Sequence, residues 1–189
     1  MRRTLIVSSL LGLLALAAPA LAGPPFVCHP FEIGAAKSLP WGVPSNFMGM
    51  RDDYNTRNLV ADTDALLTPS TPTLVRMETL RRAVMYASRD RVLADQLFAL
   101  VMNRAKAAKE QRRQDAMAFL DAGFVAESLT EIQEAAPYMK AFAGLNVALA
   151  GVTRGVSGRA LIETSASWRP DDESIRLALS LLGPKPLLP

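Results

Sequence analysis

Residues 74–134 read LVRMETLRRAVMYASRDRVLADQLFALVMNRAKAAKEQRRQDAMAFLDAGFVAESLTEIQE, and this stretch decides the fold. Apolar residues recur in it at three- and four-residue spacings, the period of an amphipathic α-helix. The first helix is expected to bury one face and to carry its arginines on the others. The apolar face comprises Leu74, Met77, Leu80, Val84 and Ala87, and the arginines are Arg76, Arg81, Arg82 and Arg89.

Two more helices are expected within this stretch. Ser88-Arg89-Asp90 supplies a cap and a turn before a second helix with a wide apolar stripe. Because this connection is short, the first two helices are predicted to lie antiparallel as a helical hairpin. A third element runs on to Ile132, and Gly123 interrupts it. Glycine costs about 1 kcal/mol relative to alanine within a helix, so we expect either a close helix crossing or a kink there.

Helices are also predicted on both sides of the central stretch. The pattern before it favours a helix over about Thr56–Leu67, and Thr71 is the expected N-cap of the next helix. After it, Pro137 is suited to the first turn of another helix. A shorter helix is expected from Ala160 to about Ser167, and a last helix follows with Asp171 as its N-cap.

Residues 139–172 resemble one unit of the tetratricopeptide repeat family. That family repeats a pattern of large and small residues over about 34 residues in two helices, and a proline closes the unit. The chain departs from the pattern at Asn146, where the family prefers glycine, and at Leu149, which replaces an aromatic residue. The resemblance implies a protein-binding or scaffolding helical array without catalytic residues. The matching positions are Phe142, Leu145, Leu149, Gly158, Ile162, Ser165, Pro170, Asp171 and Asp172.

We therefore predict an all-α fold of antiparallel helical hairpins. The hairpins would form either a tetratricopeptide-like or α-solenoid-like array or an irregular bundle. Residues 51–183 are expected to make a single helical domain, and residues 184–189 a proline-rich tail.

The first 22 residues are predicted to be a secretory signal peptide. Arg2 and Arg3 precede an apolar run, and small residues mark a cleavage site near Ala22/Gly23. The alternative is an N-terminal membrane anchor, but the apolar run is shorter than the ~20 residues that a membrane span needs. We expect an exported protein, periplasmic or secreted, whose mature chain has no transmembrane span.

Removal of this leader changes the charge balance. The whole chain carries 21 basic and 18 acidic side chains. The leader contains two basic and no acidic ones, which leaves 19 basic and 18 acidic, a formal net charge of +1. A nearly neutral protein has no global field that attracts nucleic acid, so we expect no nucleic-acid partner.

Residues 23–50 are rich in proline and glycine, which disfavours helices and central strands. Apolar and aromatic side chains are nevertheless spread through this segment, unlike a solvated tail. We predict an extended arm that lies over the helices, with one helical turn near Phe31–Ser38. The apolar residues are Phe26, Phe31, Ile33, Leu39, Trp41 and Phe47.

The arm holds the residues with the most distinctive chemistry. Cys28 and His29 are the only cysteine and histidine of the chain, and Glu32 follows. They are candidates for a thiol nucleophile or a metal site, and Met48 and Met50 would add soft ligands suited to Cu(I). The alternative is a buried thiol and a hydrogen-bonded imidazole that fix the arm, with both methionines filling gaps. No cofactor is predicted.

A basic run near the end of the second helix is a candidate for binding an anionic partner or membrane headgroups. The alternative is a solvated helix end, where cations favour the helix dipole. The run consists of Arg104, Lys106, Lys109, Arg112 and Arg113.

The chain contains no zinc-protease, phosphate-loop, hydrolase-elbow, calcium-loop or dinucleotide motif. Our leading hypothesis is an exported, non-enzymatic helical scaffold or adaptor that binds another protein through a helical groove. The alternatives are a thiol- or metal-dependent protein that uses Cys28 and His29, and a structural subunit of an envelope complex. The sequence leaves the oligomeric state open.

Overall fold

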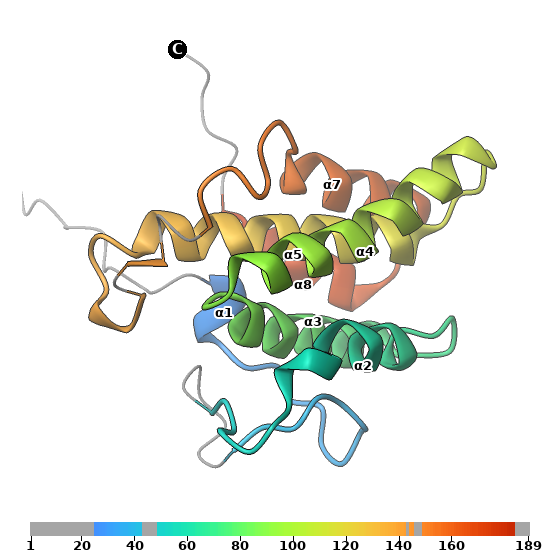
Figure 1. The fold of residues 1–189 in the computed structure, drawn as a ribbon. Coiled ribbons are helices and arrows are strands. Elements are labelled where there is room, and N and C mark those ends of the chain that lie inside the picture. Colours follow the sequence, from blue (N-terminus) through green and yellow to red (C-terminus); the bar gives the residue numbers. More distant parts are fainter. Residues whose placement is uncertain (1–24, 43–48, 143, 146–148, 184–189) are drawn as a thin grey trace, which may run out of the picture.

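A computed structural model describes residues 25–42, 49–142, 144–145 and 149–183. Every regular element in these ranges is a helix, which confirms the predicted all-α fold class (Figure 1). The elements are α1 (Pro25–Cys28), η1 (Thr56–Asn58), α2 (Leu59–Leu66), α3 (Thr73–Ala87), α4 (Arg91–Glu110), α5 (Ala116–Ala135), η2 (Lys140–Phe142), α7 (Gly158–Trp168) and α8 (Glu173–Leu181).

Several predictions fall on residues outside these ranges. The signal peptide over residues 1–22 and the tail over 184–189 lie there, and so does Met48. The tetratricopeptide-like unit is described only in part, because residues 143 and 146–148 are also outside. Around its expected first helix the described residues form turns and η2, and Leu145 and Leu149 are helical on either side of residues 146–148. That resemblance therefore stays a prediction.

Helix α5 lies at the centre of the fold. It contacts α1, α3, α4, α7 and η2, whereas α2 packs on α3 and α4, and α8 packs on α1, α3 and α7. Figure 1 shows α3, α4 and α5 alternating in direction along the molecule. The burial of α5 explains why its sequence is apolar on nearly every face: from Leu120 to Ala126 every residue is buried.

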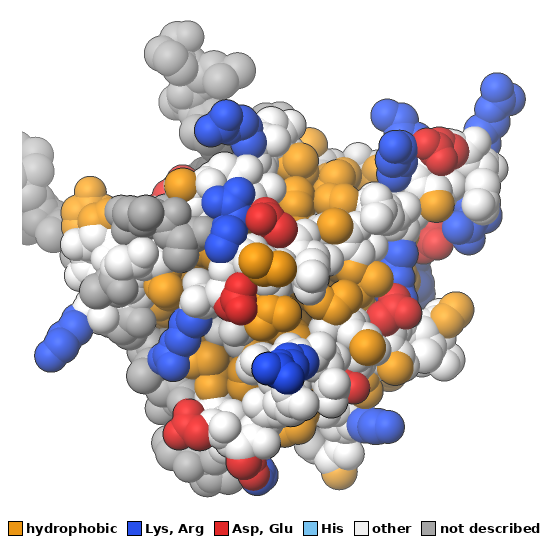
Figure 2. Space-filling model, in the orientation of Figure 1, with side chains coloured by type: hydrophobic (Ala, Val, Ile, Leu, Met, Phe, Trp, Pro, Cys, Tyr) orange, Lys and Arg blue, Asp and Glu red, His pale blue; other side chains and the backbone are white. Residues whose placement is uncertain are grey.

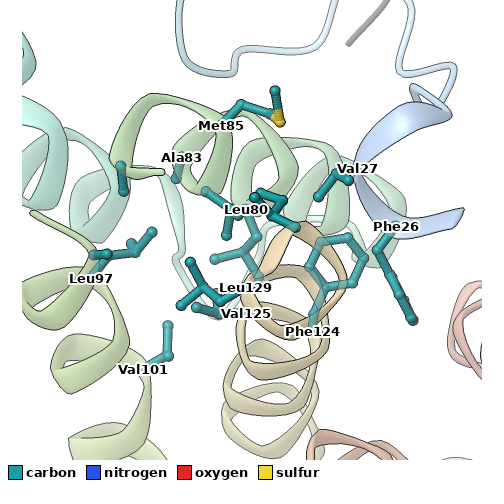
Figure 3. Packing of buried hydrophobic residues seen from close by; sticks show 14 of the residues in the cluster. Phe26, Val27, Leu80, Ala83, Met85, Leu97, Val101, Phe124, Val125 and Leu129 are labelled. Atoms are coloured by element: carbon teal, nitrogen blue, oxygen red, sulfur yellow. The ribbon is translucent and has the colours of Figure 1, made fainter. Parts of the chain in front are cut away.

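The short helix α1 inserts two side chains into the main core. Phe26 and Val27 are both fully buried, and Figure 3 shows them directed toward α3 and α5. The rings of Phe26 and Phe124 meet edge to face, with centroids 4.8 Å apart. Such pairs contribute about 0.5–1.5 kcal/mol beyond their buried area. The predicted helical turn of the arm is therefore at residues 25–28 and not at Phe31–Ser38.

Residues 29–42 continue over α3 without forming a helix. Leu39 is buried, and the Ser38 and Thr79 hydroxyl oxygens are 2.9 Å apart. The Trp41 ring packs edge to face on Tyr86 at 5.7 Å, and the Tyr86 hydroxyl donates to the Pro40 carbonyl. These contacts place the segment on one face of α3.

The helix starts follow capping rules, with two corrections to the predicted caps. Asp90 accepts hydrogen bonds from the backbone at the start of α4, as expected. Thr71 does not cap α3; its hydroxyl donates to the Leu66 carbonyl and accepts from Thr68 N–H, closing the loop onto α2. Asp172, and not Asp171, caps α8, because its carboxylate accepts from the amides of residues 174 and 175.

Gly123 marks a close helix crossing, and α5 continues through it as one helix. A Cβ atom added at Gly123 would lie 2.7 Å from the Gly158 carbonyl oxygen and 3.0 Å from Ile162 N in α7. A Cβ atom at Gly158 would lie 2.6 Å from the Gly123 carbonyl oxygen. The two glycines thus let the backbones of α5 and α7 touch, which resolves the predicted alternatives in favour of a crossing.

Gly123→Ala should destabilise the protein. In an uncrowded helix this change stabilises by up to about 1 kcal/mol, because alanine has the higher helix propensity. Here the new methyl group would press on the backbone of α7, so we expect a loss of roughly 1–3 kcal/mol in the free energy of unfolding. Urea denaturation of both proteins measures the difference. A gain in stability would contradict the crossing.

Among the residues that the structure describes, none of the helices combines the length and the apolar character needed to cross a bilayer.

Candidate functional site

Two arginines that the sequence pattern assigned to outward faces of α3 are buried. Arg81 and Glu78 are each 0% exposed, and Arg76 is 3% exposed. Arg81 makes two hydrogen bonds to the Glu78 carboxylate, of 2.7 and 2.8 Å, and Arg82 adds a third of 2.7 Å. The outward-face prediction for Arg81 is wrong because the segment after α1 covers that side of α3, and Arg76 is covered by the 68–72 loop and α5.

This charged cluster holds the N-terminal segment on α3. Glu78 accepts a hydrogen bond from Phe31 N–H, while Arg81 donates to the carbonyl of Val27. Arg82 donates to the carbonyl of Leu39. Burial alone would raise the pKa of Glu78, but hydrogen bonds and charge from the two arginines outweigh it and hold this pKa below its usual value. Glu78 therefore stays ionised and anchors both neighbours.

Cys28 ends α1 and is half-buried, whereas His29 and Glu32 are exposed. Burial, with the negative charge of Glu131 adding to it and the positive charge of Arg81 opposing it, raises the pKa of the Cys28 thiol to about 11. In the described part of the chain, no three His, Cys, Asp or Glu side chains gather as metal ligands. Met50 is half-buried against the core.

The Cys28 environment predicts slow thiol chemistry. Because the thiolate is the reactive form, a raised pKa lowers its population near neutral pH. We expect iodoacetamide to modify Cys28 at about pH 7.5 at least tenfold more slowly in the folded protein than in guanidinium chloride. Mass spectrometry of quenched samples measures both rates. Rapid modification of the folded protein would instead favour the thiol-dependent alternative.

The structure divides the predicted basic run into two groups. Arg104 and Arg113 turn back to the helical bundle: Arg104 donates to the carbonyl of Leu67 and pairs with Asp64, and Arg113 lies 3.4 Å from Asp115. The other three are exposed, as Arg113 also is at 55%, and lie at the end of α4, where Figure 2 shows Lys and Arg side chains gathered at the upper right. These exposed residues are Lys106, Lys109 and Arg112.

Arg104 and Arg113 line a cavity of about 440 Å³ at the end of the molecule where α4 stops and α5 begins. Three arginines and two aspartates supply its polar surface, and apolar side chains supply the rest. This volume lies in the range typical of ligand pockets. The lining residues are Leu67, Pro69, Arg76, Arg104, Ala107, Arg113, Asp115, Met117, Ala118 and Asp121.

A buried ion pair forms the inner part of this cavity. Arg76 Nη1 donates to Asp121 Oδ2 at 2.6 Å, and Arg76 Nη2 donates to the Thr68 carbonyl. Asp121 is 1% exposed. Among the described residues, Asp121 Oδ1 and Arg76 Nε have no hydrogen-bond partner. Buried polar atoms are usually satisfied, so these two atoms are exceptions among the buried groups of the fold.

Burial raises the pKa of Asp121 to about 6. The positive charges of Arg76 and Arg104 oppose this rise, and the hydrogen bond from Arg76 opposes it as well, while Asp115 adds to it. Arg104 Nη1 lies 4.0 Å from Asp121 Oδ2, near the limit of an ion pair. Asp121 therefore titrates close to neutral pH within a predominantly basic cavity.

The sequence contained a signal for Asp121 that periodicity alone did not reveal. Asp121 follows Met117 by four residues and precedes Phe124 by three, so it lies on an apolar face of the helix. A charged residue in such a position requires a buried partner. The partner, Arg76, is 45 residues away and could not be identified from spacing.

Two smaller hollows continue from the cavity along the same end. The first is lined by Arg113, Asp115 and Met117, which also line the cavity, together with Arg169. The second shares Arg169 and reaches Asp172 at the start of α8. We call the cavity and these two hollows together the arginine groove.

No family model, curated protein or solved structure matches this chain.

Proposed function

We propose that this chain is an exported helical scaffold protein that binds a segment of another protein in the arginine groove. The observation that supports this proposal most directly is the cavity, because it combines apolar walls with convergent charged groups. Pockets that bind ligands share this composition. The expected export comes from the leader pattern of residues 1–22.

The three hollows of the groove adjoin one another, and this arrangement favours an extended segment as the occupant of the groove. The three hollows share lining residues, so they run on from one another, from Leu67 and Pro69 past Arg113 to Asp172. Arginine is enriched at protein interfaces because its planar guanidinium group offers several hydrogen bonds. Arg113 and Arg169 are each more than half exposed and keep donor groups available.

Site-specific photo-cross-linking in the producing cell tests the proposal. A photoreactive residue at Ala107, which lines the cavity, should yield a cross-linked adduct with a partner protein. The matched control is Ala99, an exposed alanine two turns earlier on the same helix that does not line the groove. The adducts are separated by electrophoresis and identified by mass spectrometry.

Adducts from Ala107 without adducts from Ala99 are the expected result. Equal adducts from both positions would indicate non-specific collision, and no adduct from Ala107 would indicate an unoccupied groove. Either of these results would contradict the proposed function.

A further inference from the structure

The cavity presents its charged groups in two layers. Arg76 and Asp121 form a buried inner layer, at 3% and 1% exposure. Arg104 and Arg113 form the outer layer, with 29% and 55% of their side chains exposed. A ligand group that enters therefore meets Arg104 and Arg113 first.

The outer layer leaves a positive charge without a strong partner. Arg104 is paired with Asp64 of α2, but Arg113 has only a 3.4 Å contact to Asp115. The Asp115 carboxylate is also engaged as the N-cap of α5, where it accepts from the amide of residue 118. The lining residues thus carry three positive and two negative formal charges. Among the three arginines, Arg113 has the most exposed side chain and only the 3.4 Å contact to Asp115.

We infer that the cavity binds a carboxylate group from an acidic segment of the partner protein, held by Arg113 and Arg104, and that Asp121 takes up a proton as it binds. This inference rests on the proposed function and specifies the chemistry of the segment. A guanidinium group can donate two parallel hydrogen bonds to a carboxylate. The cavity should therefore bind a side-chain or C-terminal carboxylate more tightly than a ligand group with one acceptor atom. The apolar walls from Met117 and Pro69 suit the methylene groups beside it.

The proton uptake follows from the neighbours of Asp121. Positive charge faces it from α3 through Arg76 and from α4 through Arg104, and negative charge faces it from Asp115. Because the pKa of Asp121 is raised to about 6 by burial, a second negative charge nearby raises this pKa further. Asp121 then becomes neutral on binding, so the affinity for the carboxylate increases as the pH falls from about 7 to about 5.

Protein NMR with simple probes tests the inference on the full chain. Glutarate should give saturable shifts of the amides lining the cavity, whereas glutaramide, its neutral diamide, should give none. Inorganic phosphate serves as the competing anion. We expect the affinity for glutarate to rise at least threefold between about pH 7 and pH 6, a range in which glutarate stays mainly a dianion, from the linkage of one proton on Asp121.

Three variants locate the effect. Arg113→Gln should weaken glutarate binding at least fivefold, which is the loss of one charge-assisted pair. Arg112→Gln removes the same charge from the neighbouring residue, which is exposed and does not line the cavity, and should leave binding within twofold. Asp121→Asn should bind glutarate with an affinity independent of pH, and its circular dichroism spectrum should match that of the parent.

Other outcomes would overturn the inference. Equal binding of phosphate would indicate a general anion site, and equal losses in the Arg112 and Arg113 variants would indicate a diffuse charge effect. A pH dependence that persists in Asp121→Asn would exclude this residue as the proton acceptor. If Ala107 still cross-links to a partner while glutarate does not bind, the proposed function stands and the carboxylate inference fails.

Discussion

Replacing Glu78 with Gln should lower the free energy of unfolding by roughly 3–5 kcal/mol. The Glu78 carboxylate accepts hydrogen bonds from Arg81, Arg82 and the Phe31 amide. Arg81 is fully buried, so the variant would leave its charge without a counterion in the interior. A buried unpaired charge is among the most destabilising changes that one substitution can make.

The loss should appear first in the segment after α1. The arginines that Glu78 positions hold α1 on α3 through the Val27 carbonyl, and they hold the segment after it through the Leu39 carbonyl. We therefore expect limited proteolysis to cut the Glu78 variant within residues 29–42 at protease concentrations that leave the parent intact.

Urea denaturation measures the global effect, and Glu110→Gln is the matched control. Glu110 is exposed and has only a 3.9 Å contact to Lys106, so the control should change stability by less than about 0.5 kcal/mol. The Glu78 pKa is lowered in the folded state, so its contribution is present near neutral pH and is lost as the pH falls through that pKa. If both variants lose the same stability at neutral pH, the buried cluster does not anchor the fold.

The fold class was predictable because the helical period depends on local spacing. Leu80, Val84 and Leu97 are all fully buried, as the apolar stripes indicated. The helix crossing at Gly123 could also be predicted, since few physical reasons other than a crossing or a kink place a glycine inside a strongly apolar helix. Cap positions were less certain because Asp171 and Asp172 are adjacent and of the same type, and only backbone geometry decides between them.

The candidate site was less predictable, for a different reason. Amphipathic patterns assign a charged residue to the solvent side, and this rule failed at Arg76 and Arg81. Both are buried by segments that are distant in sequence, namely α1 with the chain after it for Arg81 and helix α5 for Arg76. Within the basic run, Arg113 and Arg112 are indistinguishable by composition, and the turn at the end of α4 places only Arg113 in the cavity.

Glu131→Gln is expected to stabilise the protein near pH 8 by roughly 1–3 kcal/mol. Burial, with help from the nearby Glu127 and Glu134 and against one hydrogen bond from Phe26 N–H, raises the pKa of Glu131 to about 8. The folded state therefore disfavours the ionised carboxylate, and the unfolded chain, with an ordinary pKa near 4.5, does not. This penalty is absent below the unfolded pKa and grows as the pH rises toward the folded one.

The Gln variant removes this penalty because its amide is neutral at every pH, while its carbonyl oxygen can still accept from Phe26 N–H. Urea denaturation at about pH 5 and about pH 8 should show the variant gaining stability over the parent as the pH rises. Titration of Asp121 is common to both proteins and cancels in their difference. Glu110→Gln, an exposed change on α4 that does not act on Glu131, controls for the loss of one charge. A stability difference that does not vary with pH would show that Glu131 is ionised at no cost, and that α1 rests on a charged rather than a neutral carboxyl group.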